Sequence, residues 1–284
     1  MVSPGLRGAS GAGRLGLGCA RFGSITSRLG FRQARDLVET ALSAGLFHFD
    51  TADIYGQGDS EAWLGRILAG HPHAFVSTKA GQTFSRKMQL IRPLKPVLAP
   101  IARNLGALRS GVTAARAKPL ATCFEPGYLT ARAEGSLRRL RRERLDAFFL
   151  HNPNAEVIRR QDVLEALVGM KGAGKVGLIG VSADDEATIA LALEQWPLDL
   201  IQAPLALLDF RPELGRLAEA RGVGIVAREI LGGLAGAAAD PPGPEMAKAR
   251  IINALGLTGV ISVLVGTTRK DRLLDAAAAA VAAP

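Results

Sequence analysis

Stretches of apolar, β-branched residues alternate with stretches of helical periodicity along almost the whole chain. Eight short apolar runs predict strands, at residues 15–19, 46–50, 75–79, 147–151, 177–182, 200–204, 224–227 and 260–266. Helical stretches fall between and after them, near residues 32–44, 60–69, 128–140, 161–171, 185–193, 213–221, 245–255 and 271–283. Apolar strands separated by helices are typical of a parallel sheet with crossover helices.

The eight strand-helix units predict an α/β fold in which the sheet closes on itself. We expect a single (β/α)8 (TIM) barrel domain over residues 1–284. A doubly wound open sheet is the alternative. That fold binds dinucleotides through a GxGxxG turn after its first strand, and no such motif follows residues 15–19.

Residues 84–121 interrupt the alternation and are interpreted as an insertion. This segment has eight Lys or Arg and no acidic residue, with prolines at positions 93, 96, 100 and 119. A short amphipathic helix is predicted by the spacing of Val97, Leu98, Ile101, Leu105 and Leu108. Because the segment follows the third strand, we expect it to form a lid over the catalytic face. A disordered segment and an anchor on an anionic membrane surface are the alternatives.

The formal net charge of +9 is unevenly distributed. Residues 84–144 contain fourteen Lys or Arg against three Glu, so the rest of the chain is slightly negative. Basic character confined to one segment, without a motif that interleaves aromatic and basic residues, argues against a nucleic-acid partner.

Several other classes of protein find no support in the sequence. No apolar run approaches the roughly 18 residues of a membrane span, and residues 1–14 do not resemble a signal peptide. We therefore expect a cytoplasmic protein without stable membrane insertion. Cys19 and Cys123 are far apart and match no metal-ligand spacing, so we expect neither a disulfide nor a metal site.

Polar residues stand at the ends of three successive predicted strands. These residues are Asp50, Lys79 and His151, and Tyr55 follows Asp50 in the next loop. The carboxyl ends of barrel strands meet at one mouth, so all four side chains should converge. Taken singly, a helix cap, a solvated charge and a core histidine are ordinary explanations. Their delivery at the same end favours a shared site.

These residue types suit the reduction of a carbonyl by hydride. The reaction builds negative charge on oxygen and needs a nearby acid and hydrogen-bond donors. Tyr55 can be that acid. An ammonium such as that of Lys79 at about 4 Å could lower the phenol pKa from about 10 by up to about 3. Asp50 would hold Lys79, and His151 would orient the substrate oxygen.

Five segments together resemble the aldo-keto reductases. FHFDTADIYGQGDSEAWLG (47–65) is similar to the family signature, in which an aspartate is followed five residues later by the catalytic tyrosine, then by Gly, Ser-Glu and Leu-Gly. VSTKAG (76–81) and LDAFFLHNP (145–153) resemble the lysine and histidine strands of the family. GKVGLIGVS (174–182) and VLVGTTRKDRLLDA (263–276) are similar to its cofactor segments.

The resemblance implies a (β/α)8 barrel with a catalytic tetrad of Asp50, Tyr55, Lys79 and His151. It also implies an NAD(P)H-dependent enzyme that transfers a hydride between NADPH and the carbonyl of an aldehyde or ketone, reversibly. Its partner would be a small-molecule carbonyl or alcohol substrate. The alternative is a regulatory or redox-sensing subunit that binds NADP with little turnover.

The resemblance further assigns residues to NADP(H). Ser182 and Gln202 match residues that hold the nicotinamide carboxamide, although Ala183 replaces the Asn that usually follows the serine. Arg228 stands where many members stack an aromatic ring, and a planar guanidinium can also stack. The phosphate loop and the adenine side match Gly266, Thr267, Thr268, Arg269, Arg272 and Asp275. A solvated basic helix start is the alternative for the arginines.

Overall fold

The structure is a computed structural model, and it describes residues 6, 11–24, 27, 29–83, 120–232 and 243–283. Parallel strands close into a barrel in the order β1-β10-β9-β8-β7-β6-β3-β2. The barrel strands are β1 (Leu15–Gly18), β2 (His48–Asp50), β3 (Phe75–Ala80), β6 (Leu145–His151), β7 (Val176–Ser182), β8 (Leu200–Pro204), β9 (Gly224–Arg228) and β10 (Val260–Val265). The predicted (β/α)8 barrel is therefore confirmed, and the open-sheet alternative is wrong.

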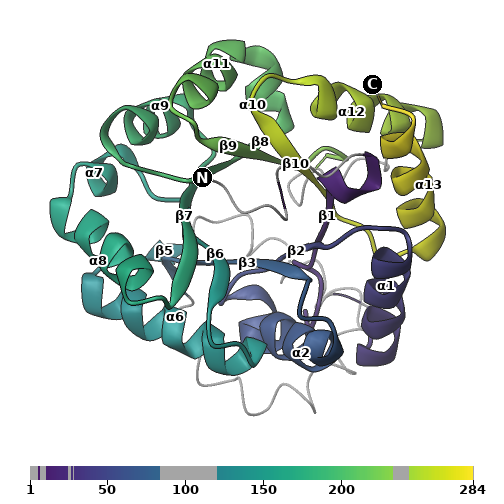
Figure 1. The fold of residues 1–284 in the computed structure, drawn as a ribbon, viewed down its shortest axis with the longest axis horizontal. Coiled ribbons are helices and arrows are strands. Elements are labelled where there is room, and N and C mark those ends of the chain that lie inside the picture. Colours follow the sequence, from purple (N-terminus) through teal and green to yellow (C-terminus); the bar gives the residue numbers. More distant parts are fainter. Residues whose placement is uncertain are drawn as a thin grey trace, which may run out of the picture.

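Helices form a ring around the barrel (Figure 1). The longer ones are α1 (Phe31–Ser43), α2 (Asp59–Ile67), α6 (Pro126–Leu140), α8 (Gln161–Gly172), α9 (Glu186–Gln195), α11 (Pro212–Ala220), α12 (Pro244–Gly256) and α13 (Lys270–Val281). Their bounds differ from the predicted ones by at most two residues. The shorter ones, which the sequence did not predict, are η1 (Gly11–Arg14), η2 (Tyr55–Gly58), η3 (Leu68–Gly70), α7 (Ala155–Ile158) and α10 (Leu205–Phe210).

Local sequence explains where several helices begin. The side chain of Asp185 accepts a hydrogen bond from the Thr188 backbone N–H at 2.8 Å, which caps the first turn of α9. Pro126 opens α6, where its missing N–H leaves no intrahelical bond unmade. Helix α1 buries Leu37 and Val38 on the side that faces the barrel and leaves charged residues on the other.

Two apolar clusters form the core. One fills the barrel interior and consists of Leu6, Phe75, Ala147, Phe149, Leu178, Leu200, Val226 and Leu264. The larger one lies between the strands and the helices. Alternation along β6 shows how one strand serves both, because Phe149 belongs to the interior cluster while Phe148 and Leu150 belong to the outer one.

The barrel interior becomes polar toward the carboxyl ends of the strands. Along β3, alternate residues read Phe75, Ser77 and Lys79, and all three are buried. The last inward-facing positions of neighbouring strands include Asp50 and His151. The interior is thus apolar at the base and carries its charged and hydrogen-bonding groups at the mouth.

A small antiparallel ribbon follows β3. Its strands are β4 (Gln82–Thr83) and β5 (Ala121–Thr122), with Thr83 opposite Ala121. Residues 84–119, which separate the two strands in the sequence, lie outside the described residues, so the predicted lid and its helix stay predictions. Within the described ranges, none of the helices is both long and apolar enough to span a membrane.

Candidate active site

The four residues of the predicted tetrad come from three neighbouring strands and one loop. Asp50 ends β2, Lys79 lies on β3 and His151 ends β6, and these strands are adjacent in the barrel (Figure 1). Tyr55 begins the short helix η2 that follows β2. The arrangement brings all four side chains to the same mouth.

A buried ion pair forms the centre of the site. Lys79 Nζ lies 2.6 Å from Asp50 Oδ2, and both side chains are almost fully buried. The ammonium also donates to the Thr51 carbonyl oxygen at 2.9 Å. Because a buried ammonium is stable only when it is paired and hydrogen-bonded, these two contacts fix the position of Lys79.

Tyr55 packs between the ion pair and His151. Lys79 Nζ is 5.3 Å from the centroid of the Tyr55 ring. The ring meets the imidazole of His151 edge to face, with centroids 5.8 Å apart and an interplanar angle of 85°. The phenol is therefore held between the charge of Lys79 and the imidazole of His151.

The electrostatics of Tyr55 differ from the sequence expectation. Burial raises the pKa of the phenol above its ordinary value of 10, and Lys79 lowers it by a smaller amount. Asp50 adds to the rise, because the phenol faces an ion pair rather than a lone ammonium. The expected net lowering of the Tyr55 pKa is therefore wrong. The phenol keeps its proton at neutral pH.

His151 is neutral at physiological pH. Burial, with the charges of Lys79 and Arg228, lowers the pKa of its imidazole well below 6.5. Within the described part of the chain, its buried Nδ1 makes no hydrogen bond. A neutral imidazole with an uncommitted nitrogen can hydrogen-bond to a substrate oxygen.

The loop that carries Tyr55 is tied down on both sides. The Asp53 backbone N–H donates to the Lys79 carbonyl at 3.0 Å, and the Asp53 carboxylate pairs with Arg132 Nε of α6 at 2.5 Å. Burial raises the pKa of Asp53 to about 6, although Arg132 opposes the shift. Gly56 has φ +58°, and a Cβ there would lie 2.6 Å from the Phe22 carbonyl oxygen. Only glycine allows this close approach.

Ser182 and Gln202 lie beside the tetrad. Ser182 Oγ donates to Gln202 Oε1 at 2.9 Å, and Gln202 Nε2 donates to Asp50 Oδ1 at 2.9 Å. Both side chains are buried. The two residues expected to hold the nicotinamide are thus hydrogen-bonded to each other, and Gln202 is hydrogen-bonded to the Asp50 carboxylate, a connection that the sequence did not predict.

Arg228 is held at the end of β9. Its guanidinium pairs with Asp184 and Glu229 and donates to the Ala183 carbonyl at 3.1 Å. Its charge lowers the pKa of both Tyr55 and His151. The structure thus places a fixed guanidinium near the mouth, and stacking of this group on a nicotinamide stays a prediction.

The predicted phosphate residues lie at the start of α13. Arg269 stands at the N-cap position of this helix and pairs with Asp271 in the first turn, and both side chains are exposed. The Arg269 backbone N–H donates to Thr267 Oγ1 at 3.1 Å. The remaining assigned residues, Gly266, Thr268, Arg272 and Asp275, are exposed or half-buried in the same segment. Arg269 is therefore paired with a carboxylate at the place where the resemblance assigns a phosphate.

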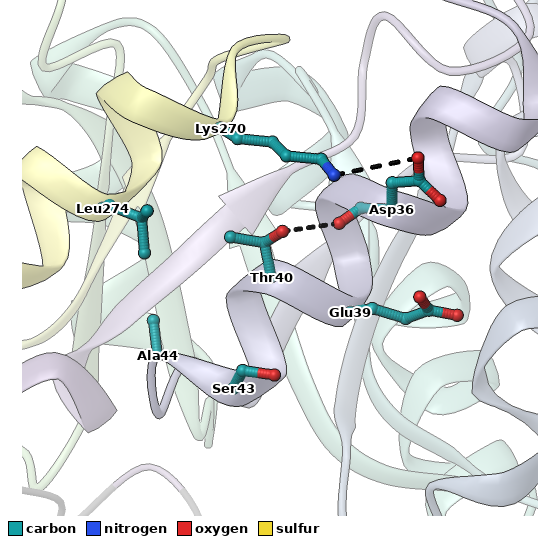
Figure 2. A pocket seen from close by; sticks show the side chains of 7 residues that line it. All are labelled: Asp36, Glu39, Thr40, Ser43, Ala44, Lys270 and Leu274. Atoms are coloured by element: carbon teal, nitrogen blue, oxygen red, sulfur yellow. Dashed lines mark hydrogen bonds and ion pairs between the residues drawn. The ribbon is translucent and has the colours of Figure 1, made fainter.

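A hollow of about 520 Å³ lies elsewhere, between α1 and α13 (Figure 2). It is lined by Asp36, Glu39, Thr40, Ser43, Ala44, Lys270 and Leu274. Lys270 Nζ is 3.7 Å from Asp36 Oδ2 across this hollow. None of the four tetrad residues lines it, so it is separate from the chemistry at the barrel mouth.

Sequence reasoning missed three polar residues below the tetrad: His48, Ser77 and Ser262. The imidazole of His48 bridges Ser77 Oγ and Ser262 Oγ, and Ser77 Oγ donates to Asp50 Oδ1. For two of the three, the available signal was the alternation His48-Asp50 and Ser77-Lys79, which puts His48 and Ser77 on the same strand face as a tetrad member. A lone polar residue in a strand does not by itself reveal this connection.

Sequence comparison identifies a family and several relatives of this protein. A model of the aldo/keto reductase family matches residues 14–250. D-threo-aldose 1-dehydrogenase from Pseudomonas sp is 31% identical over 191 residues, covering 66% of this chain and 55% of that protein. Pyridoxal 4-dehydrogenase from Microbacterium luteolum is 27% identical over 250 residues, covering 81% of this chain and 70% of that protein. The chain thus spans little more than half of the aldose dehydrogenase.

Solved structures share the barrel. The holo form of an aldo-keto reductase from Bacillus halodurans superposes with a TM-score of 0.74 at 22% identity, covering 95% of this chain and 87% of that one. An aldo-keto reductase from Klebsiella pneumoniae in complex with NADPH gives 0.66 at 18% identity, covering 94% and 84%. These likenesses support the fold. Because the family model matches residues 14–250, which make up most of the chain, this protein belongs to the aldo/keto reductase family, a family of oxidoreductases.

Proposed function

We propose that this protein is an NADPH-dependent oxidoreductase that interconverts a carbonyl and an alcohol, with Tyr55 as the proton donor. The observation that carries the proposal is the placement of Tyr55 between His151 and the Asp50–Lys79 ion pair at one barrel mouth. Family membership supports it. Two relatives are named as dehydrogenases, one of a D-threo-aldose and one of pyridoxal, which favours a small aldehyde or sugar as substrate.

The residues divide the work of carbonyl reduction. NADPH supplies the hydride when it is bound. Tyr55 donates its phenolic proton to the carbonyl oxygen as negative charge develops there. The neutral imidazole of His151 hydrogen-bonds to the same oxygen and fixes its position. Lys79 stabilises the phenolate that remains on Tyr55, and Asp50 holds Lys79 in place.

The mouth also fits the nicotinamide cofactor. A carboxamide needs both a donor and an acceptor, and the buried hydroxyl of Ser182 and amide of Gln202 offer both beside Asp50. The plane of Arg228 would lie against the nicotinamide ring. At the far end, Arg269 and Arg272 would bind the 2′-phosphate of NADP(H) at the start of α13. Gly266, Thr267 and Thr268 would line the phosphate loop, with Asp275 near the adenine.

The test is NADPH oxidation by the purified protein against a panel of aldehydes, ketones, quinones and sugars. Wild type should turn over at least one class, and Tyr55→Phe should lose turnover while it still binds NADPH, as followed by fluorescence. Tight NADPH binding by wild type without turnover of any carbonyl or alcohol would contradict the proposal. That result would favour a regulatory NADP-binding barrel.

A further inference from the structure

A chain of hydrogen bonds runs beneath the tetrad through three strands. Ser262 Oγ of β10 lies 2.9 Å from His48 Nδ1 of β2, and His48 Nε2 lies 2.8 Å from Ser77 Oγ of β3. Ser77 Oγ in turn lies 2.8 Å from Asp50 Oδ1. All four side chains are buried. The chain therefore ends on the carboxylate that holds Lys79.

The Asp50 carboxylate determines which group donates and which accepts in each of these hydrogen bonds. Lys79 donates to Asp50 Oδ2, and Ser77 donates its single hydroxyl hydrogen to Asp50 Oδ1. Ser77 Oγ then accepts from His48, which must carry its proton on Nε2. Burial, with the charge of Lys79, lowers the pKa of His48 to about 4, although Asp50 opposes the shift, so the ring is neutral. Its bare Nδ1 accepts from Ser262.

The surroundings of His48 leave its ring one position. A Cβ on Gly16 would lie 2.9 Å from His48 Nδ1, so the glycine in β1 gives the imidazole its space. On another side the ring meets Phe75 edge to face, with centroids 5.2 Å apart. Both ring nitrogens are hydrogen-bonded. The imidazole is thus locked by packing and by hydrogen bonds together.

Packing alone does not explain a histidine here. An apolar side chain of similar size would fill the same space without placing polar atoms in a barrel interior, where desolvation is costly. The polar ring instead satisfies both serines, and a chain of aligned hydrogen bonds strengthens each member. The Asp50 carboxylate receives the end of this chain on Oδ1 and presents Oδ2 to Lys79.

We infer that His48 is a positioning residue for the proposed reaction: through Ser77 it fixes the Asp50 carboxylate in the orientation that holds Lys79 beside Tyr55. This inference rests on the proposed function. Without the His48 donor, Ser77 can rotate away from Asp50, and the carboxylate loses one of its fixed partners. The ion pair then loosens beneath the phenol.

The test compares two substitutions at His48 with a packing control. His48→Leu removes both hydrogen bonds. His48→Gln keeps an amide N–H that can donate to Ser77 and an oxygen that can accept from Ser262. Phe75→Leu disturbs the packing of the same ring but leaves the hydrogen-bonded chain intact. Each variant is compared with wild type in its turnover of the best carbonyl substrate, its NADPH dissociation constant and the pH profile of kcat.

We expect His48→Leu to lower kcat about 10-fold with little change in the NADPH dissociation constant, because positioning acts on the chemical step. Of the two charges of the ion pair, Lys79 has the larger effect on Tyr55, so loosening the pair should move the basic limb of the profile to higher pH. His48→Gln should recover most of the rate and the wild-type profile. Equal rate losses in His48→Leu and Phe75→Leu, with unchanged pH profiles, would overturn the inference.

A second measurement needs no variant and no turnover. In ¹⁵N-labelled wild type, the imidazole of His48 should show a slowly exchanging proton on Nε2 and an unprotonated Nδ1. A proton on Nδ1 would reverse the chain and overturn the inference. Absence of turnover in wild type would instead contradict the proposed function, while the tautomer measurement would still report on the chain.

Discussion

At the scale of single residues, the mouth is built around an acid that keeps its proton. Burial raises the pKa of Tyr55, and the ion pair of Lys79 with Asp50 offsets only part of that rise. The phenol is therefore available as a donor throughout the neutral range. Its acidity is set first by burial and then by a pair of opposite charges rather than by a single cation.

Removing the phenolic hydroxyl should abolish the proton donor without disturbing the packing. Tyr55→Phe keeps the ring that meets His151 edge to face. General acid catalysis contributes about 100- to 10,000-fold, so we expect kcat to fall on that scale while NADPH affinity changes little. Stopped-flow hydride transfer, with cofactor occupancy followed by fluorescence, measures both. Similar transfer rates in the two proteins would show that Tyr55 is not the acid.

Lys79→Met should damage both rate and stability. The substitution leaves the Asp50 carboxylate buried without its main partner, which costs about 3–5 kcal/mol of unfolding free energy. It also removes the charge that lowers the Tyr55 pKa, so the basic limb of the rate profile should move to higher pH. The double variant Asp50→Asn with Lys79→Met serves as control.

The double variant replaces both charges by neutral groups. It should regain much of the unfolding free energy in urea titrations but none of the lost rate. If the single and double variants were equally unstable, the loss would come from packing rather than from the unpaired carboxylate.

At the scale of elements, the sequence predicts the regular alternation of strands and helices but not the short helix and the two-stranded ribbon that interrupt it. The eight strands were predicted because each is a short apolar run between longer amphipathic stretches. Helix α10 was missed because Leu205–Phe210 is too short to show a helical period and directly continues the apolar run of β8. The ribbon of β4 and β5 has only two residues in each strand, which carry no pattern.

The candidate site could likewise be predicted only where a sequence pattern marks its residues. Asp50, Lys79 and His151 could be located because each ends a predicted strand, and Tyr55 because it lies in the loop after Asp50 and its phenol can serve as an acid. His48 could not, since its role depends on serines 29 and 214 positions away in sequence. The ion pair of Arg269 with Asp271 was equally hidden, because sequence spacing does not fix where an exposed guanidinium points.

The start of α13 supports a prediction about cofactor preference. Arg269→Ala should weaken NADPH binding roughly 10- to 100-fold, the range expected for a lost charge-assisted hydrogen bond to the 2′-phosphate, and should leave NADH binding nearly unchanged. Asp271→Asn is the matched control. It frees Arg269 from its present partner and should strengthen NADPH binding. An equal loss for both cofactors in Arg269→Ala would remove the 2′-phosphate assignment.

The ribbon makes the basic segment removable. Thr83 and Ala121 are paired, so a short turn can join β4 to β5 after residues 86–118 are deleted. We expect the barrel to fold without them, and kcat/KM for an anionic substrate to lose its dependence on salt, because screening acts on the deleted charges. Substrate preference should change as well. Unchanged salt dependence and preference in a folded variant would contradict the predicted lid.

At the scale of the whole molecule, buried titratable groups make the stability of the barrel depend on pH. The pKa of His48 is lowered from 6.5 to about 4, so the unfolded chain binds more protons than the folded one between these values. Stability from this group is complete above pH 6.5 and is lost as the pH falls toward 4. Asp53, with its pKa raised to about 6, acts in the opposite sense, since stability from it is lost as the pH rises through 6.

A substitution separates the two contributions. As the pH falls from 6.5 to 4, protonation of His48 in the unfolded chain should lower the free energy of unfolding by about 3 kcal/mol. His48→Gln should remove this pH-dependent loss. Urea unfolding of both proteins at pH 7 and pH 4.5 measures the difference. Wild type should lose more stability than the variant on acidification. Parallel losses in the two proteins would show that His48 does not titrate over this range.

The buried hydrogen-bonded residues His48, Ser77 and Ser262 have a consequence for thermal stability. Apolar residues in place of both His48 and Ser262 would remove a buried hydrogen-bonded pair together, and such a joint replacement can be nearly neutral or stabilising in a well-packed core. Selection for thermal stability alone should therefore favour apolar residues in the barrel interior up to the mouth. Such variants would be heat-stable but would turn over slowly, so screens on this barrel need to select for activity as well as stability.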